Sequence, residues 1–316
     1  MHLAALLGSL LAGLLAGKRL SFFPQLWVER LTSWTLYFLI LAMGLRIGRT
    51  EEVASGFARI GLAALGYAAA TVLGTVLALW PLFSLFSRPG SLARRAADAE
   101  KAAPQRPAGG SSRLRLGLLA APLKLLGLLG LGLLIGRLAP VGASIRGAAV
   151  TNGILYALLF LIGISLRRSG FKPRELLDPS LWILPVGTLA GSLAGGLALA
   201  LLIGQRAGRG LSLAAGFGWY SLSGVLLIQL DGPALGATAF LANLMRESLS
   251  LLLIPLLART RFPFLAIGVG GATSMDVTLP LIEIHCGPRA VPFAVASGAT
   301  LSVLVPVLVP LLYPLG

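Results

Sequence analysis

The sequence predicts an all-helical protein that crosses a membrane many times. Hydrophobic residues make up 56% of its 316 residues and charged residues only 12%, and its mean hydropathy is +0.88. An average soluble domain carries about 25% charged residues. The 40 glycines and 19 prolines agree with a membrane protein, because membrane helices tolerate both residues better than soluble helices do. The composition therefore excludes a soluble enzyme, a disordered chain and a disulfide-bonded scaffold.

The net charge of +15 does not indicate a nucleic-acid partner. Most Lys and Arg residues lie between apolar runs, where they set the orientation of a membrane protein. The single cysteine, Cys286, excludes an internal disulfide and a cysteine-based zinc site, and we expect no metal and no cofactor. The apolar start of the chain, residues 1–17, has no basic segment before it, which favours a retained first span over a cleaved signal peptide.

Ten apolar stretches approach the roughly 20 residues that a helix needs to cross a bilayer. They are residues 3–17, 31–47, 57–85, 114–137, 147–166, 180–204, 211–230, 235–258, 264–284 and 290–312. The first stretch is short and the ninth is interrupted by Gly and Pro. We therefore expect about ten transmembrane helices, and eight if these segments are re-entrant.

Residues 87–115 separate the third stretch from the fourth. They are rich in Arg, Ala, Pro and Gly and hold seven Lys and Arg residues. Such a segment buries too little apolar surface to order itself, so we interpret it as a cytosolic linker within a single membrane domain. It divides a first helical unit, residues 1–86, from a second, residues 116–204, and residues 205–316 form a third part. Alternate loops differ moderately in Lys and Arg content, which places both termini outside the cytoplasm.

The second and fifth stretches resemble each other. Residues 36–49 read LYFLILAMGLRIGR and residues 155–168 read LYALLFLIGISLRR. A repeat of three spans contains an odd number of crossings, so the second unit would be inverted relative to the first. Inverted repeats and interrupted helices are typical of secondary transporters.

Polar residues deep in a membrane span are informative because each charged one costs roughly 2.5–3.5 kcal/mol to insert. Of the 11 acidic residues, only Glu247 and Asp276 lie well inside spans. In the eighth span, Asn243, Arg246, Glu247 and Ser250 follow helical spacing and form one polar stripe. The stripe either bonds this helix to its neighbours or lines the path of a substrate or ion.

The ninth span contains a break in its expected helix. Three glycines, at 268, 270 and 271, precede Thr273, Ser274, Asp276 and Pro280. Glycine costs about 1 kcal/mol and proline about 3 kcal/mol within a helix. Interrupted helices expose backbone groups that bind ions and charged ligands. Asp276, in the middle of the break, is therefore a candidate for substrate binding or ion coupling, together with Thr273 and Ser274.

The seventh span repeats this design. Its glycines at 216 and 218 precede four candidate site residues, Trp219, Tyr220, Ser221 and Ser223. Aromatic residues also form belts at the edges of membranes. This pair falls near the middle of the apolar run, which favours the wall of a cavity.

These segments resemble the LysO family of bacterial lysine exporters. The resemblance is carried by GFGWYSLSG at 216–224, by the pair Arg246–Glu247 and by GATSMDVTLP at 271–280, and it is close over residues 211–285. It implies an inner-membrane carrier that exports L-lysine and its analogues, with a fold akin to cation/proton antiporters and bile-acid-type carriers. Members of the family often carry a further Asp where this chain has Asn243.

The residues fit such a substrate chemically. L-Lysine carries two ammonium groups, which Asp276 and Glu247 can bind, and one carboxylate, which Arg246 or the backbone amides of residues 271–273 can bind. An acid in a dry cavity takes up a proton more readily than in water, so lysine and protons could exchange in an antiport. The partners expected are L-lysine or a related cationic amino acid, protons or another coupling ion, the lipid bilayer and, as one assembly to consider, a second copy in a homodimer.

Two alternatives stay open at the level of sequence. A carrier of another amino acid or small ion could use the same fold. An intramembrane protease, with Ser223 and His285 as a dyad, is less favoured because His285 falls at the end of a span and no G-x-G-D motif surrounds Asp276. No GxxxxGK[ST] motif is present, so nothing supports ATP-driven transport within this chain.

Overall fold

The computed structural model describes residues 3–19, 24–49, 56–85, 112–138, 147–168 and 179–315, and every regular element in these ranges is a helix. This confirms the all-helical class. The long helices are α1 (Leu3–Arg19), α2 (Gln25–Gly48), α4 (Phe57–Leu85), α6 (Ser112–Leu138), α7 (Gly147–Arg168), α8 (Pro179–Leu202), α11 (Pro233–Leu257) and α14 (Val291–Leu312). The shorter ones are α9 (Ala207–Ala214), α10 (Tyr220–Asp231), α12 (Leu265–Gly270) and α13 (Leu279–Cys286), with 3-10 turns η2 (Gly271–Met275) and η3 (Pro288–Ala290).

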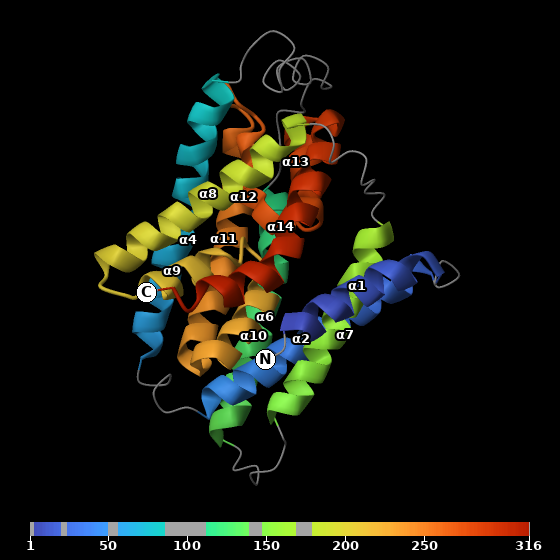
Figure 1. The fold of residues 1–316 in the computed structure, drawn as a ribbon, viewed down its shortest axis with the longest axis vertical. Helices are drawn as coiled ribbons and strands as arrows, with labels where there is room; N and C mark the ends of the chain where they lie inside the picture. Colours follow the sequence, from blue (N-terminus) through green and yellow to red (C-terminus); the bar gives the residue numbers. More distant parts are fainter. Residues whose placement is uncertain are drawn as a thin grey trace.

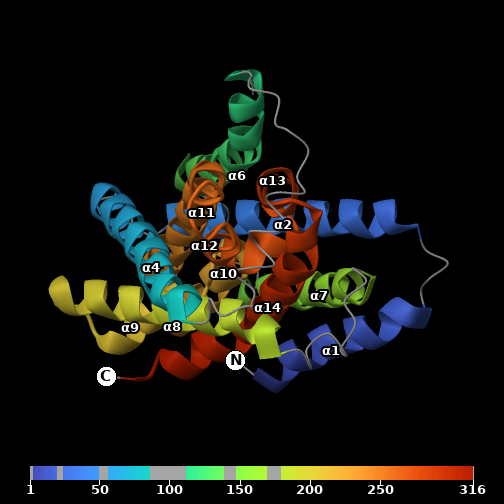
Figure 2. The same ribbon diagram turned by 90° about the horizontal axis from the view of Figure 1, so that it is seen from above.

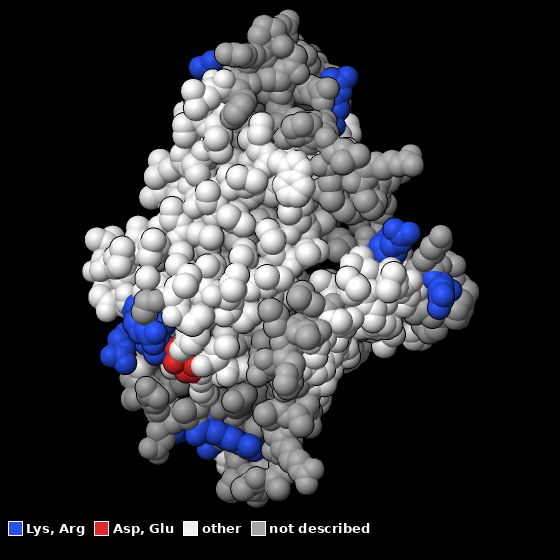
Figure 3. All heavy atoms as spheres, in the orientation of Figure 1, with Lys and Arg blue, Asp and Glu red and all other residues white. Residues whose placement is uncertain are grey.

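Four of the described helices are long and apolar enough to cross a membrane, and their spans are Ala58–Leu85, Leu181–Leu202, Pro233–Leu257 and Pro288–Leu312. The expected count of about ten crossing helices is not confirmed. Large apolar side chains are exposed on the surface, among them Leu62 and Leu202, as expected where a helix faces lipid. On the face drawn in Figure 3, the described Lys and Arg residues lie at the edges and the middle is uncharged.

The first six long helices pack in three pairs: α1 along α7, α2 along α6, and α4 along α8. Glycines allow each pair to approach closely. A Cβ atom on Gly13 would overlap the carbonyl oxygen of Phe160, and one on Gly44 would overlap that of Leu129. Exchanging α1 with α6, α2 with α7 and α4 with α8 leaves the three pairings unchanged. A repeat of three helices would produce this symmetric pairing. The inversion of the second repeat stays a prediction.

The expected linker, residues 87–115, lies outside the described residues up to position 111, and α6 begins at Ser112 within its last four residues. The two similar segments, residues 36–49 and 155–168, fall in α2 and α7.

The last third of the chain forms the middle of the molecule. Seen from above, α10, α11 and α12 are central, with α4 and α8 on one side and α1, α2 and α7 on the other (Figure 2). In the view of Figure 1, α12 and α13 lie above α10. Both expected helix breaks are present, one between α9 and α10 and one between α12 and α13. These breaks place irregular backbone at the centre of the bundle.

Candidate functional site

The two helix breaks touch each other. The first contains Phe217 and Gly218, with positive φ angles of 47° and 96°, and the second contains Gly271, with φ of 61°. The backbone N–H of Ala272 donates a hydrogen bond to the carbonyl oxygen of Phe217 at 2.9 Å. A Cβ atom on Gly271 would overlap that same oxygen. Glycine is therefore needed at 271 both for its left-handed backbone and for the close approach of the two segments.

The polar stripe on α11 binds the backbone of both breaks. Asn243 is buried; its Oδ1 accepts from the N–H of Gly218 at 2.8 Å, and its Nδ2 donates to the Ser223 hydroxyl at 3.1 Å. Two helical turns after Asn243, the Ser250 hydroxyl lies 2.6 Å from the carbonyl oxygen of Val269, just before the second break. Irregular backbone away from water needs such partners. The stripe therefore has a structural role at Asn243 and Ser250.

Arg246 reaches from α11 to the paired helices α4 and α8. Its side chain is 1% exposed, and its two terminal nitrogens donate to the Ser192 hydroxyl on α8 at 2.7 Å and to the Thr75 hydroxyl on α4 at 3.3 Å. The two hydroxyls end similar segments, TVLGT at 71–75 and TLAGS at 188–192. Among the described residues, Arg246 forms no ion pair with an acid. Its guanidinium is instead held by matching positions of the paired helices α4 and α8.

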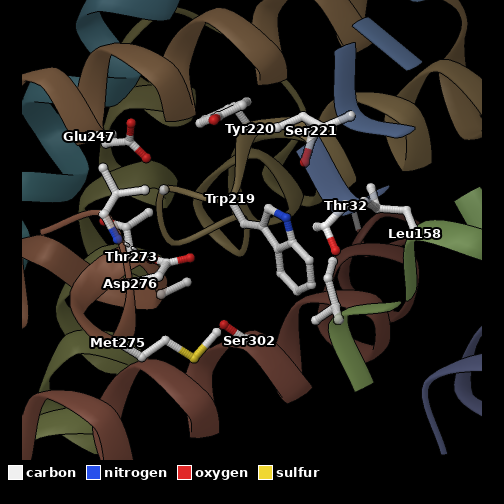
Figure 4. A pocket seen from close by; sticks show the side chains of 15 residues that line it. Thr32, Leu158, Trp219, Tyr220, Ser221, Glu247, Thr273, Met275, Asp276 and Ser302 are labelled. Atoms are coloured by element: carbon white, nitrogen blue, oxygen red, sulfur yellow. Dashed lines mark hydrogen bonds between the residues drawn. The ribbon is translucent and has the colours of Figure 1, made fainter. Parts of the chain in front are cut away.

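A cavity of about 170 Å³ opens beside the point where the two breaks meet. Six of the ten candidate site residues line it: Trp219, Tyr220, Ser221, Glu247, Thr273 and Asp276. Figure 4 shows Glu247, Thr273 and Asp276 on one side of the cavity and Trp219 at its centre. The structure thus brings together residues from the seventh, eighth and ninth apolar stretches. The cavity is smaller than the roughly 300–1,000 Å³ of many ligand pockets, which suits a small molecule.

Two acidic residues, Glu247 and Asp276, line the cavity. Glu247 is 2% exposed, and its Oε2 atom has no hydrogen-bond partner in the part of the chain described here. Asp276 is exposed, and its Oδ1 accepts from the N–H of Val277. The described lining residues include no Lys or Arg. Two acids without a basic side chain among these residues have the chemistry that could bind a cation.

The other four candidates do not line the cavity. Asn243 and Ser223 bond each other, and Ser223 also donates to the carbonyl oxygen of Trp219 at 2.8 Å. The Ser274 hydroxyl lies 2.8 Å from the carbonyl oxygen of Ala294 on α14. Arg246 extends toward α4 and α8, as described above. These four side chains support the walls of the site and do not face its interior.

Several lining residues were not expected from the sequence. Thr32 and Ser302 add hydroxyl groups, and Met275, Leu36, Leu158 and Ile162 add apolar surface. Thr32 and Leu158 lie across the cavity from the two acids in Figure 4. A single hydroxyl or leucine in a membrane helix has no sequence signature, because such residues are common on every face. No group of three His, Cys, Asp or Glu side chains within the described ranges could hold a metal ion.

Comparison with known proteins assigns the chain to a family. The sequence model for the lysine exporter LysO family matches residues 7–93 and 126–313. The chain belongs to the LysO family. It is 34% identical over 280 residues to the lysine exporter LysO of Escherichia coli K12, covering 88% of both chains. It is 39% identical over 155 residues to a putative lysine exporter of Haemophilus influenzae, covering 48% of this chain and 78% of the relative.

The LysO family match covers all the cavity residues and both helix breaks. The unmatched stretch between residues 93 and 126 contains most of the expected linker. No solved structure matches the chain, so the expected likeness to cation/proton antiporters and bile-acid-type carriers has no support from known folds. Membership of the LysO family, together with the apolar helices, makes this a bacterial inner-membrane protein and points to a transporter rather than an enzyme.

Proposed function

We propose that this protein exports L-lysine and its close analogues from the cytoplasm, in exchange for protons, through the acidic cavity between the two helix breaks. Membership of the LysO family supports lysine export. The cavity supports a cationic substrate, because it combines two carboxyl groups with a small volume. The proposal thus rests on a substrate class from the family and on a binding chemistry from the site.

The proposal is carried by one observation, the burial of the Glu247 carboxyl group at the cavity wall. A buried carboxylate costs several kcal/mol of desolvation unless an opposite charge compensates it. Glu247 faces the cavity, and its Oε2 atom has no hydrogen-bond partner within the described ranges. The neighbouring cation, Arg246, donates instead to Thr75 and Ser192. Either a proton or a bound ammonium group can compensate the negative charge of the Glu247 carboxylate. A proton and a substrate ammonium group would therefore compete for this residue.

The N-terminus of α10 supplies a place for the substrate carboxylate. This helix has 12 residues, and its first turn, at Trp219, Tyr220 and Ser221, lines the cavity without a side-chain cap. The N–H groups of Trp219 and Tyr220 already donate to the carbonyl oxygens of Gly216 and Gly218. An anion here would therefore rely on the helix dipole and on the N–H group of Ser221. We expected residues 271–273 or Arg246 in this role, but residues 271–275 form only a 3-10 turn and Arg246 lies outside the lining. An amino acid with its carboxylate at α10 and its ammonium groups at Glu247 and Asp276 would bridge both breaks.

Counterflow of radiolabelled L-lysine into proteoliposomes tests this function. We expect uptake with the wild type and uptake at background level for Asp276→Asn and Glu247→Gln, because each change removes a charge that binds the ammonium groups. Glu283→Gln is the matched control, since Glu283 is exposed on α13 and does not line the cavity. It should keep wild-type uptake.

The outcomes separate the alternatives. Folded wild-type protein that exchanges another small cation but not L-lysine would assign a different substrate to the same cavity. Asp276→Asn protein that is inserted, stable and fully active would contradict the proposed role of the acids.

A further inference from the structure

We propose that an anionic phospholipid binds in a second hollow of the molecule, where α12 and α14 begin. This hollow has a volume of about 380 Å³ and is lined by Phe264, Arg289, Pro292 and Phe293. None of these residues lines the acidic cavity. The lipid site is therefore separate from the proposed transport site and does not depend on which substrate the protein carries.

Two loops lie side by side at this hollow. The Sγ atom of Cys286, the last residue of α13, lies 3.4 Å from the carbonyl oxygen of Pro263, just before α12. The rings of Phe264 and Phe293, which both line the hollow, pack with centroids 5.2 Å apart. The loop after α11, residues 258–264, and the loop after α13, residues 287–290, therefore belong to one surface.

This surface is basic. Arg259 and Arg261 are exposed in the first loop, and Arg289 is exposed in the second. None of the three forms an ion pair with an acid in the described ranges. Arg289 also lies two residues before α14, a helix of 22 residues with no acidic residue in its first turn and no side-chain cap. The guanidinium of Arg289 and the dipole of α14 both favour an anion, such as a phosphate group, beside the hollow.

Aromatic side chains indicate that this surface lies at the level of the lipid headgroups. Phe262 packs against Trp80 and Phe83 near the end of α4, with ring centroids 5.4 Å and 6.0 Å apart. Helix α4 is long and apolar enough to cross a membrane, and its cyan end lies at the same end of the molecule as α13 (Figure 1). Trp80 is 44% exposed. An exposed Trp near the end of a crossing helix is typical of the membrane–water interface.

An anionic phospholipid matches both the charge and the walls of the hollow. Its phosphate can bind Arg289, while Arg259 and Arg261 add to the local positive charge, and basic pockets between membrane helices bind such headgroups. Its acyl chains can pack against Pro292 and Phe293. A free phosphate ion would use the arginines but leave these apolar walls without a partner. The lining therefore favours a lipid over a soluble anion.

Titration with phosphatidylglycerol in a neutral detergent tests the site. Native mass spectrometry of the intact chain measures the dissociation constant of the first lipid that binds. We expect Arg289→Gln to raise this constant about fivefold or more, the usual contribution of one basic side chain beside an anionic lipid. Arg289→Lys should restore most of the affinity, because it restores the charge. Phosphatidylcholine, which has no net charge, should show no such difference between the wild type and Arg289→Gln.

Arg30→Gln is the matched control, because Arg30 is also exposed beside an aromatic ring, that of Trp27, but lines neither the cavity nor the hollow. It should bind phosphatidylglycerol as the wild type does. Wild-type affinity in Arg289→Gln, or equal weakening by both substitutions, would overturn the proposal. Displacement of the lipid by an equal concentration of inorganic phosphate would overturn it too, because the ligand would then be a soluble anion. Lysine counterflow bears on the proposed function alone, since lipid binding is measured without transport.

Discussion

At the scale of single residues, the structure explains why an amide suits position 243 better than a carboxylate would. Its amide nitrogen is within hydrogen-bond distance of the Leu213 and Ala239 carbonyl oxygens as well as the Ser223 hydroxyl. A carboxylate offers no donor to these carbonyls. The side chain therefore supports the backbone of the first helix break and lies outside the cavity lining.

Arg246 gives a prediction at the same scale. Lysine has one compact ammonium group, whereas the planar guanidinium reaches Ser192 and Thr75 at once. In Arg246→Lys one of these buried hydroxyls loses its donor, so we expect a loss of about 1–3 kcal/mol in the free energy of unfolding and slower lysine counterflow. Thermal unfolding in detergent and counterflow measure the two effects.

The control for this change is Arg259→Lys, because Arg259 is exposed between α11 and α12. It should match the wild type in both measurements. An Arg246→Lys protein that also matches the wild type would show that the two hydroxyls are not held together by the guanidinium.

At the scale of elements, the sequence allowed both helix breaks to be predicted but not the shape of the segments that contain them. Clustered glycines at 216–218 and 268–271 disfavour a continuous helix whatever surrounds them. A stretch of about 20 apolar residues, however, suits one crossing helix or two half-helices equally well. In the structure, the contacts of Arg209 with Asp231 and of Cys286 with Pro263 bring the two ends of each segment together. Such pairs of distant residues have no signal in a single sequence.

The pairing of α4 with α8 gives a prediction for elements. Gly191 on α8 faces Gly74 on α4, and a Cβ atom on Gly191 would overlap the Gly74 carbonyl oxygen. Gly191→Ala should push the helices apart next to Thr75 and Ser192, which hold Arg246. We expect a loss of about 1–3 kcal/mol in the free energy of unfolding, measured as a lower unfolding temperature in detergent.

Gly61→Ala, on α4, is the matched control, because no atom outside its own helix lies within 4 Å of the added Cβ. This change should leave stability equal or raise it by up to about 1 kcal/mol, since alanine favours helix more than glycine. Equal effects of the two substitutions would contradict close packing of α4 on α8.

At the scale of the whole molecule, basic and acidic residues are separated. The edges of the face in Figure 3 carry Lys and Arg, whereas the cavity at the centre carries Glu247 and Asp276 and no described basic residue. A cation in an apolar core is costly, and the two acids could offset part of this cost beside the point where the two helix breaks meet. The sequence predicted both acids from their depth in the spans. It could not show that Arg246, adjacent to one of them, turns away from both.

The proposed exchange of lysine for a proton predicts how lysine binding depends on pH. If a proton must leave the acids before lysine binds, the lysine concentration for half-maximal counterflow should rise as the pH falls. For one exchanged proton, the rise would approach tenfold per unit at pH values below the pKa of the exchanging acid, and measurements at pH 8 and pH 6 would compare the two conditions. Lysine keeps most of its ammonium protons over this range, so the change would report on the protein. Glu247→Gln, measured by binding because its transport should be lost, should flatten the dependence. Glu283→Gln should leave it unchanged. A wild-type protein with equal half-maximal concentrations at both pH values would exclude protons as the coupled ion while leaving lysine export in place.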